Sequence, residues 1–179
     1  DFGHIYITDQ PLLCRCGRQG CLETVASEQI ISKNISKHFG LRRSLIGDEL
    51  IEYLKELVKK GNTYSLDLLK YIAYYLGKGI HNFVSISDPQ EIIISGRLNR
   101  LNPLFSNLIS EEYMKCAKHN PVGIVPLNFI EYQEKAGLIG TAIFSFISVF
   151  CSVSHLSSLQ LTKNRITYKE YNQYASFGG

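Results

Sequence analysis

The sequence has no tryptophan, one methionine and five prolines among its 179 residues. It also has no apolar run of the about 20 residues that a membrane-spanning helix needs. The formal net charge is only +3, which is too small an excess to indicate a nucleic-acid-binding surface by itself. Nothing in the chain resembles a secretion signal or an internal repeat. We therefore expect no membrane insertion and a reducing, cytoplasmic setting.

The remaining composition is that of an ordinary globular protein, with 45% hydrophobic and 20% charged residues. A chain of 179 residues can form one domain or two small lobes. It has no starting methionine and opens directly on a motif, so we expect it to be the C-terminal part of a longer protein.

Three of the five cysteines, Cys14, Cys16 and Cys21, fall within eight positions that also contain two glycines and two arginines. With His4 they supply three thiolates and one imidazole, a complete tetrahedral ligand set for Zn²⁺. The glycines let the backbone turn tightly enough for the sulfurs to converge on one ion, and the arginines would offset part of the thiolate charge. A closed four-ligand site leaves no position for water, so such a zinc ion would be structural.

A cysteine-rich turn without metal, or a disulfide, is the alternative interpretation. A single residue separates Cys14 from Cys16, which strains a disulfide between them, and three clustered cysteines leave one unpaired. A reducing environment also disfavours a disulfide. The spacing therefore favours zinc. Cys116, far from this cluster in the sequence, is interpreted as a small buried hydrophobic residue.

The sequence Asp1-Phe2-Gly3-His4 and the segment 14–23 together resemble the ROK family, whose name stands for repressor, open reading frame, kinase. That family carries a Glu-x-Gly-His element followed by Cys-x-Cys-Gly-x-x-Gly-Cys-Leu-Glu. The resemblance implies an α/β fold: the C-terminal lobe of an actin-like, ribonuclease-H-like sugar kinase fold, with a zinc-binding loop near the N-terminus. It implies a lobe for sugar binding and oligomerisation over residues 1–150, and leaves residues 151–179 as an unassigned tail.

The resemblance also implies roles for single residues. His4 and the three clustered cysteines would hold the structural zinc, and His4 would offer its other ring nitrogen to a sugar hydroxyl. Glu23 matches a sugar-binding glutamate of the family. Asp1 stands where the family has a glutamate, and its side chain is one methylene shorter. The catalytic aspartate and phosphate loop of ROK kinases lie in the half that this chain lacks, so no catalytic residue is expected here.

Residues 91–95 form a short, continuous apolar run that predicts a buried strand, and Gly96 follows it at once. ROK kinases follow the corresponding strand with two or three glycines that lie against ATP. This chain has only Gly96, and Arg97 comes next. Regulators of the family tolerate such replacements because they need not bind ATP. Gly96 would contact a nucleotide, with Mg²⁺, only if the protein were a kinase.

The apolar pattern further predicts several helices and short strands, and the strands are expected at residues 4–8 and 124–130. Helices are expected at 22–39, 48–60, 65–87 and 102–119, with a last one beginning near 136. Two glycines inside the third of these helices, Gly77 and Gly79, are costly for helix formation. We expect them to allow close approach of another helix or of the sheet.

Two functions follow from the resemblance. The favoured one is the sugar-sensing, effector-binding part of a transcriptional regulator of carbohydrate metabolism, with DNA bound by an upstream helix-turn-helix domain that is absent here. The alternative is the C-terminal lobe of an ATP-dependent kinase acting on glucose, fructose or an N-acetylhexosamine. In both cases we expect a homodimer or tetramer. A third interpretation is a zinc-stabilised remnant without sugar affinity.

Overall fold

The computed structural model describes residues 1–118, 123–130 and 136–150. The chain divides into two compact units, residues 1–132 and 133–179. The described part of the second unit is helix α5 (Ala136–Phe150), the last helix that the sequence predicts. The predicted tail lies outside the described residues. None of the helices described in either unit combines the length and apolar character needed to span a bilayer.

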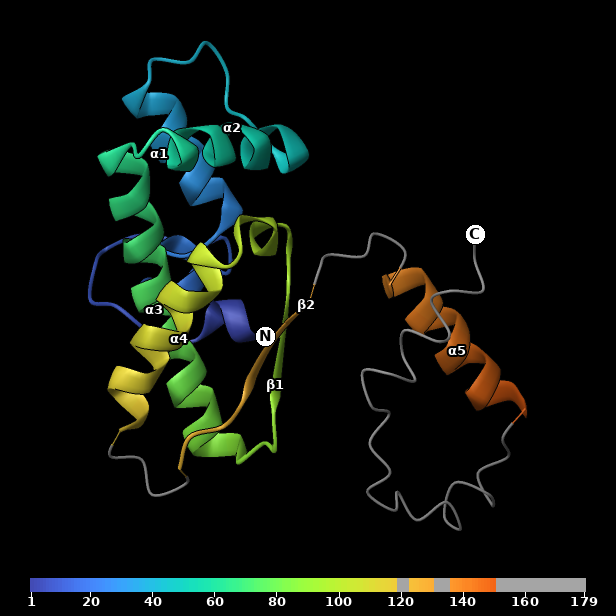
Figure 1. Cartoon of the computed structure of the whole chain (residues 1–179). Coiled ribbons are helices and arrows are strands. Elements are labelled where there is room, and N and C mark those ends of the chain that lie inside the picture. Colours follow the sequence, from blue (N-terminus) through green and yellow to red (C-terminus); the bar gives the residue numbers. More distant parts are fainter. Residues whose placement is uncertain (119–122, 131–135, 151–179) are drawn as a thin grey trace. The chain divides into compact units, whose positions relative to one another are not determined.

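The first unit is built around two helices, α3 (Thr63–Ser87) and α4 (Leu104–Ala117), which lie side by side (Figure 1). Gly77 allows this close contact, because a Cβ atom built on it would lie 2.7 Å from both Glu112 Cβ and Tyr113 N. Real Cβ atoms do not approach other atoms so closely. The predicted close approach of another helix is therefore confirmed at this glycine.

Helices α1 (Glu28–His38) and α2 (Gly47–Lys59) complete the core at one end of α3 (Figure 1). Apolar side chains from all four helices pack into one cluster that is shielded from water, and this burial is the main source of stability in the unit. The most deeply buried members include Ile31, Ile35, Leu50, Leu54, Leu69, Ile72, Phe105 and Ile109.

Strands β1 (Ile92–Ser95) and β2 (Leu127–Ile130) form a two-stranded parallel sheet. The predicted strands at 91–95 and 124–130 are thus confirmed, with shorter bounds. The expectation that β1 is buried is wrong for one face, because Ile93 is 59% exposed. Side chains alternate across a strand, and in this sheet only one face packs on the core.

A short turn of 3₁₀-helix, η3 (Arg97–Leu101), follows β1 and fixes the ends of both strands. The buried Asn99 donates from Nδ2 to Ile94 O and to Ile130 O, each at 2.7 Å. One amide group therefore satisfies a carbonyl from each strand at the carboxyl end of the sheet.

The expected strand over residues 4–8 is wrong. The chain begins with a 3₁₀ turn, η1 (Phe2–His4), which Asp1 caps by accepting a backbone hydrogen bond. The segment after it is extended and makes only an isolated bridge between Tyr6 and Cys21. The alternating apolar residues therefore lie in an extended segment that pairs with no regular strand among the described residues.

The expected helix over residues 22–39 is interrupted. A 3₁₀ turn, η2 (Leu22–Thr24), comes first, and α1 begins only at Glu28. The side chain of Ser27 caps α1 by accepting a hydrogen bond from Ile30 N at 3.4 Å. Serine favours the N-cap position over the helix interior, because its hydroxyl accepts a hydrogen bond from the backbone of the first turn. The apolar stripe that predicts one helix is therefore divided between η2 and α1.

Two other helices begin earlier than the sequence predicts. Asp48 lies in the first turn of α2 rather than at its N-cap, and Ser65 lies in the first turn of α3. Asn62 is the N-cap of α3, and its Oδ1 accepts a hydrogen bond from Ser65 N at 2.9 Å. Both shifts are about one turn or less, within the usual variation of helix ends.

Candidate functional site

The loop between Cys14 and Cys21 folds back on itself through two tight turns. Hydrogen bonds from Cys14 N to Arg18 O (2.8 Å) and from Gly17 N to Cys14 O (2.9 Å) close the first. Gly17 and Gly20 have φ angles of +85° and +78°, a region that side chains disfavour. A Cβ on Gly20 would also lie 2.3 Å from Thr8 O. The glycines are needed for this loop, as the sequence predicts.

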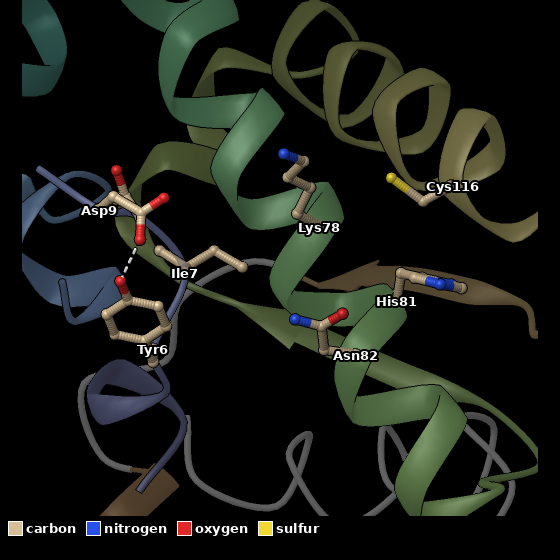
Figure 2. Close-up of a pocket in the computed structure, with 8 residues that line it drawn as sticks. Tyr6, Ile7, Asp9, Lys78, His81, Asn82 and Cys116 are labelled. Carbon is tan, nitrogen blue, oxygen red and sulfur yellow. Dashed lines mark hydrogen bonds between the residues drawn. The ribbon is translucent and has the colours of Figure 1, made fainter.

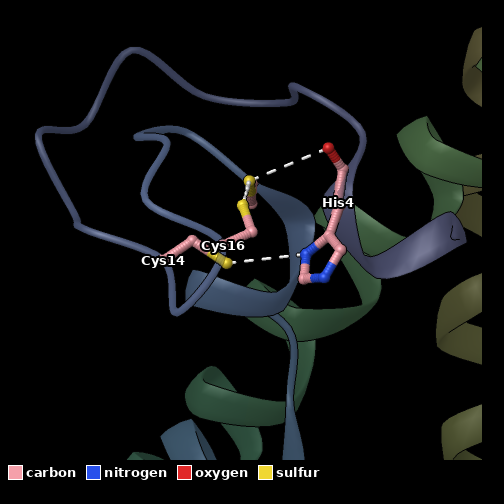
Figure 3. Close-up of side chains that lie close together, drawn as sticks. His4, Cys14 and Cys16 are labelled. Carbon is pink, nitrogen blue, oxygen red and sulfur yellow. Dashed lines mark hydrogen bonds between the residues drawn. The ribbon is translucent and has the colours of Figure 1, made fainter.

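The turns bring the ligand atoms of His4, Cys14, Cys16 and Cys21 within 4.8 Å of one another (Figure 3). His4 Nδ1 lies 3.5 Å from Cys14 Sγ, and Cys16 Sγ lies 3.6 Å from Cys21 Sγ. Donors around a tetrahedral zinc ion are about 3.5–3.8 Å apart, given metal–nitrogen and metal–sulfur bonds of about 2.0 and 2.3 Å. The geometry and chemistry of this donor set therefore fit a zinc ion.

The thiols of this cluster differ in their protonation. Hydrogen bonds from the backbone and side chain of Arg18 lower the pKa of Cys16 to about 6. Burial, followed by the neighbouring thiols, raises the pKa of Cys21 to about 11. No disulfide joins the cysteines in the described part of the chain. Before any metal binds, Cys16 therefore loses its proton more readily than Cys21 does.

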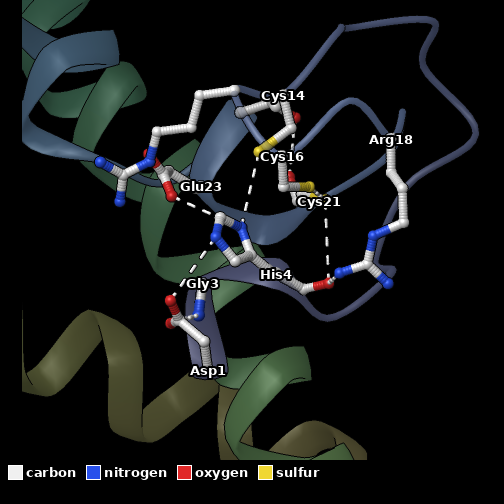
Figure 4. Close-up of polar contacts among 10 residues, drawn as sticks. Asp1, Gly3, His4, Cys14, Cys16, Arg18, Cys21 and Glu23 are labelled. Carbon is white, nitrogen blue, oxygen red and sulfur yellow. Dashed lines mark hydrogen bonds and ion pairs between the residues drawn. The ribbon is translucent and has the colours of Figure 1, made fainter.

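The imidazole of His4 also lies between two carboxylates (Figure 4). Its Nε2 is 3.5 Å from Asp1 Oδ2, and its Nδ1 is 3.6 Å from Glu23 Oε2. The other oxygen of Glu23, Oε1, lies 2.9 Å from Arg15 Nε. The structure therefore brings together the three residues predicted to bind sugar. Two carboxylates and an imidazole can hold several hydroxyl groups at fixed angles.

Gly96, the predicted nucleotide contact, lines a neighbouring cavity of about 530 Å³ at the carboxyl end of β1. Phe2, next to Asp1 in sequence, lines the same cavity. Arg97 Nη1 lies 3.6 Å from Glu28 Oε2, and Arg97 Nε lies 3.7 Å from Asp48 Oδ1. The arginine that replaces a family glycine is thus held by the first turns of α1 and α2.

Two sets of ion pairs in this region are not evident from the sequence. Arg15 and Glu23 pair across the loop, and no predicted helix or strand pair contains both residues so that its period would bring them together. The partners of Arg97 come from distant helices. Asn99 could have been identified, because asparagine after a glycine turn commonly caps backbone groups.

The family model named ROK family matches residues 1–145. The chain belongs to the ROK family. Relatives with two kinds of function are similar to this ROK chain. The DNA-binding transcriptional dual regulator NagC of Escherichia coli K12 is 28% identical over 127 residues, covering 67% of this chain and 31% of NagC. A glucokinase of Thermotoga maritima is 23% identical over 150 residues, covering 79% of this chain and 47% of the glucokinase.

The fold is likewise that of ROK proteins. The crystal structure of a ROK hexokinase from Thermus thermophilus matches with a TM-score of 0.69 and 23% sequence identity. The match covers 83% of this chain and 48% of the hexokinase. The α/β, actin-like fold class expected from the sequence is thereby confirmed. This ROK chain spans less than half the length of each of these three proteins.

Proposed function

We propose that this ROK chain binds a sugar through Asp1, His4 and Glu23, and that it is the effector-binding part of a sugar-responsive transcriptional regulator. One observation supports the sugar site above all. The ring of His4 lies 3.5 Å from the thiol of Cys14 on one edge and 3.5 Å from the carboxylate of Asp1 on the other. The same imidazole can therefore belong to a metal cluster and to a hydroxyl-binding surface.

The residues of the cluster would hold one zinc ion through His4 Nδ1 and the three thiolates. A structural zinc of this kind supplies folding free energy, about 10–16 kcal/mol in zinc-finger peptides at neutral pH. The protein's own contribution is orientation: the loop fixes the ring of His4 so that Nε2 faces Asp1. Although aspartate is shorter than the family's glutamate, its carboxylate still reaches the ring.

The same arrangement can recognise a polyhydroxylated ligand. The carboxylates of Asp1 and Glu23 accept hydrogen bonds from hydroxyl groups, and His4 Nε2 can donate or accept one. The Glu23 side chain is only 22% exposed, so its carboxylate is already largely shielded from water. Binding a sugar hydroxyl therefore removes little further water from this carboxylate and adds a charge-assisted hydrogen bond.

The regulator function is supported by the surroundings of Arg97. Phosphoryl transfer from ATP needs a loop that cradles the phosphates and a bound metal ion. The position after Gly96 instead carries an arginine whose guanidinium contacts Glu28 and Asp48. Where ROK kinases have a further glycine, this chain therefore has Arg97, whose side chain is held between α1 and α2.

A ROK sugar kinase is the second candidate. It is supported by the similarity to the Thermotoga glucokinase over 79% of this chain and by the cavity of about 530 Å³ that Gly96 lines. ATP and Mg²⁺ would then bind with the help of residues outside this chain. In either case we expect this part of the protein to contribute to a homodimer or tetramer, which sedimentation would measure.

Calorimetric titration of glucose and N-acetylglucosamine into the intact protein tests the sugar site. We expect saturable binding of at least one sugar, and Glu23→Gln should weaken it by about tenfold or more, since a charged acceptor is lost. Zinc content should not change. Glu56→Gln, on the outer face of α2, is the matched control and should bind as the parent does. Absence of any sugar response would favour a remnant without function.

A second measurement separates regulator from kinase. The intact protein is incubated with the bound sugar, ATP and Mg²⁺, and ADP release is followed. We expect no turnover above background, and we expect the sugar to change affinity for an operator DNA. Sustained ADP release that depends on the sugar would establish the kinase instead.

A further inference from the structure

A second cavity, of about 290 Å³, is lined by none of the proposed sugar-binding or zinc-binding residues (Figure 2). It forms where the extended segment 6–9 meets α3 and α4. Neither Asp1, His4 nor Glu23 lines it, and neither does Gly96. Its walls combine polar and apolar surface, contributed by Tyr6, Ile7, Thr8, Asp9, Lys78, His81 and Asn82, with Cys116 from α4.

The helices place polar groups here for a simple geometric reason. Lys78, His81 and Asn82 are spaced i, i+3 and i+4, so they share one face of α3. His81 follows Gly77, a position of close contact between α3 and α4, by one helical turn. Cys116 follows Glu112, the contact of Gly77 on α4, also by one turn. The cavity is therefore next to a rigid helix contact, which keeps its walls in place.

The α3 wall combines one buried polar atom without a partner, on His81, with the side chains of Lys78, which is partly exposed, and Asn82, which is exposed. Lys78 Nζ lies 4.5 Å from the centre of the Tyr74 ring, but it makes no ion pair with any carboxylate that the structure describes. The side-chain amide of Asn82 makes no hydrogen bond to a described residue. His81 Nδ1 is buried and has no hydrogen-bond partner among the described atoms. Of these three residues only His81 has a buried side-chain atom without a partner. Buried polar atoms are normally paired, so His81 Nδ1 indicates a missing partner on this wall.

The other side of the cavity differs in charge. Asp9 accepts a hydrogen bond from the hydroxyl of Tyr6, and a carboxylate has capacity for further donors. A ligand that satisfies both sides must carry a negative group for Lys78, His81 and Asn82, and a hydroxyl for Asp9. The volume is at the lower end of the about 300–1,000 Å³ usual for ligand sites, so the ligand must be small.

We propose that this cavity is a second ligand site, which binds a small hydroxylated oxyanion: a phosphate ester or a hydroxy acid of a few carbon atoms. The ammonium, imidazole and amide of the α3 wall hold the anionic group, and Asp9 accepts a hydrogen bond from a hydroxyl of the ligand. None of the residues that line this cavity is a proposed sugar-binding residue or zinc ligand. Its ligand could therefore act as a second effector of the same protein.

Titration of the intact protein in a phosphate-free buffer tests this proposal, with glycerol 3-phosphate and glycerate as the two probes. We expect saturable binding of at least one of them, and the stronger binder identifies the anionic group as phosphoryl or carboxylate. Lys78→Met should weaken binding by about tenfold or more, because a charge-assisted contact is lost. Lys70→Met is the matched control: this lysine is on the same helix, pairs with Asp67 and does not line the cavity.

Two further variants keep the test decisive if Lys78→Met fails to fold, which thermal melting would show. Asn82→Ala should also weaken binding, and Asp9→Asn should reduce the preference for glycerol 3-phosphate over inorganic phosphate. No saturable response to either probe would overturn the proposal. Equal affinity in Lys78→Met, Asn82→Ala and Lys70→Met would overturn it too, because the ligand would then bind elsewhere.

Discussion

Arg15 and Glu23 form an ion pair across the cysteine loop, with Arg15 Nε 2.9 Å from Glu23 Oε1. Arg15 stands between two of the proposed zinc ligands, and Glu23 is the glutamate proposed to bind sugar. The pair therefore links the metal loop to the sugar site. Because the Arg15 side chain is 73% exposed, the pair contributes little to stability. Its effect is to hold one carboxylate oxygen so that the other, Oε2, faces His4.

Replacing Arg15 with methionine should therefore lower sugar affinity without removing zinc. We expect a loss of about three- to tenfold, because the carboxylate stays in place but is less well oriented. Calorimetry gives the affinity, and metal analysis of the same samples gives the zinc content. Arg42→Met, an exposed arginine with no carboxylate partner in the described structure, is the control. Unchanged affinity in Arg15→Met would show that the ion pair has no part in binding.

The zinc proposal predicts different outcomes for two cysteine variants. Cys16→Ser should lose the metal and unfold the N-terminal third, since the loop would lack one of its four ligands, and far-UV circular dichroism should show an overall loss of ordered structure. Cys116→Ser should keep one zinc per chain, because this cysteine lies on α4, away from the cluster. Metal analysis by mass spectrometry measures both. A parent protein purified without chelators that contains no zinc would contradict the proposal.

The metal-free loop should show an unusual pattern of thiol reactivity. The thiolate is the reactive form, and the pKa of Cys16 is lowered to about 6 whereas that of Cys21 is raised to about 11. As pH rises, alkylation at Cys16 should therefore increase through about pH 6 and level off near neutrality. Alkylation at Cys21 should still be rising at about pH 9. Iodoacetamide labelling followed by peptide mapping measures both sites.

The cause of this pattern can be tested at Arg18. Its hydrogen bonds favour the Cys16 thiolate, so Arg18→Met should move the midpoint of Cys16 labelling to higher pH, toward the ordinary value for a thiol. The backbone hydrogen bond remains in the variant, so part of the lowering should persist. A midpoint that does not move would show that the Arg18 side chain has no part in lowering the pKa of Cys16. Adding zinc should protect Cys16 and Cys21 together.

The cysteine loop could be predicted from the sequence because everything that forms it is local. Ligands and glycines lie within a few residues, and the positive φ angles at Gly17 and Gly20 follow from the need to turn. The helices were also predictable from apolar periodicity. The residues at which the helices begin were harder to predict, because a single side-chain hydrogen bond, such as that of Ser27, decides where a helix begins.

Other features depend on contacts between distant parts of the chain, which a local pattern does not contain. Ile93 appears in the sequence as part of a buried run, yet its exposure depends on which face of the sheet is covered. The sequence shows that Arg97 departs from the family pattern, but not that Glu28 and Asp48 hold it. The cavity beside Lys78 needs three separate segments to meet, so no single motif could indicate it.

The two glycines of α3 differ in what surrounds them, and this difference predicts opposite effects on stability. Near Gly77, a new methyl group would meet the backbone of α4, with Tyr113 N at 2.7 Å and Glu112 C at 2.8 Å. Near Gly79, it would meet only side-chain ends, with Leu22 Cδ2 at 3.1 Å and Phe2 Cζ at 3.2 Å. Backbone cannot move aside as a side-chain end can.

Gly77→Ala should therefore destabilise the protein by about 1–3 kcal/mol, because overpacking at the helix contact outweighs the better helix propensity of alanine. Gly79→Ala should be neutral or slightly stabilising, since side chains can shift by a few tenths of an ångström and the helix gains about 0.5–1 kcal/mol. Urea unfolding followed by circular dichroism measures both. Equal stability of the two variants would mean that α3 and α4 are not in rigid contact at Gly77, and the cavity one turn beyond it would then lack a fixed wall.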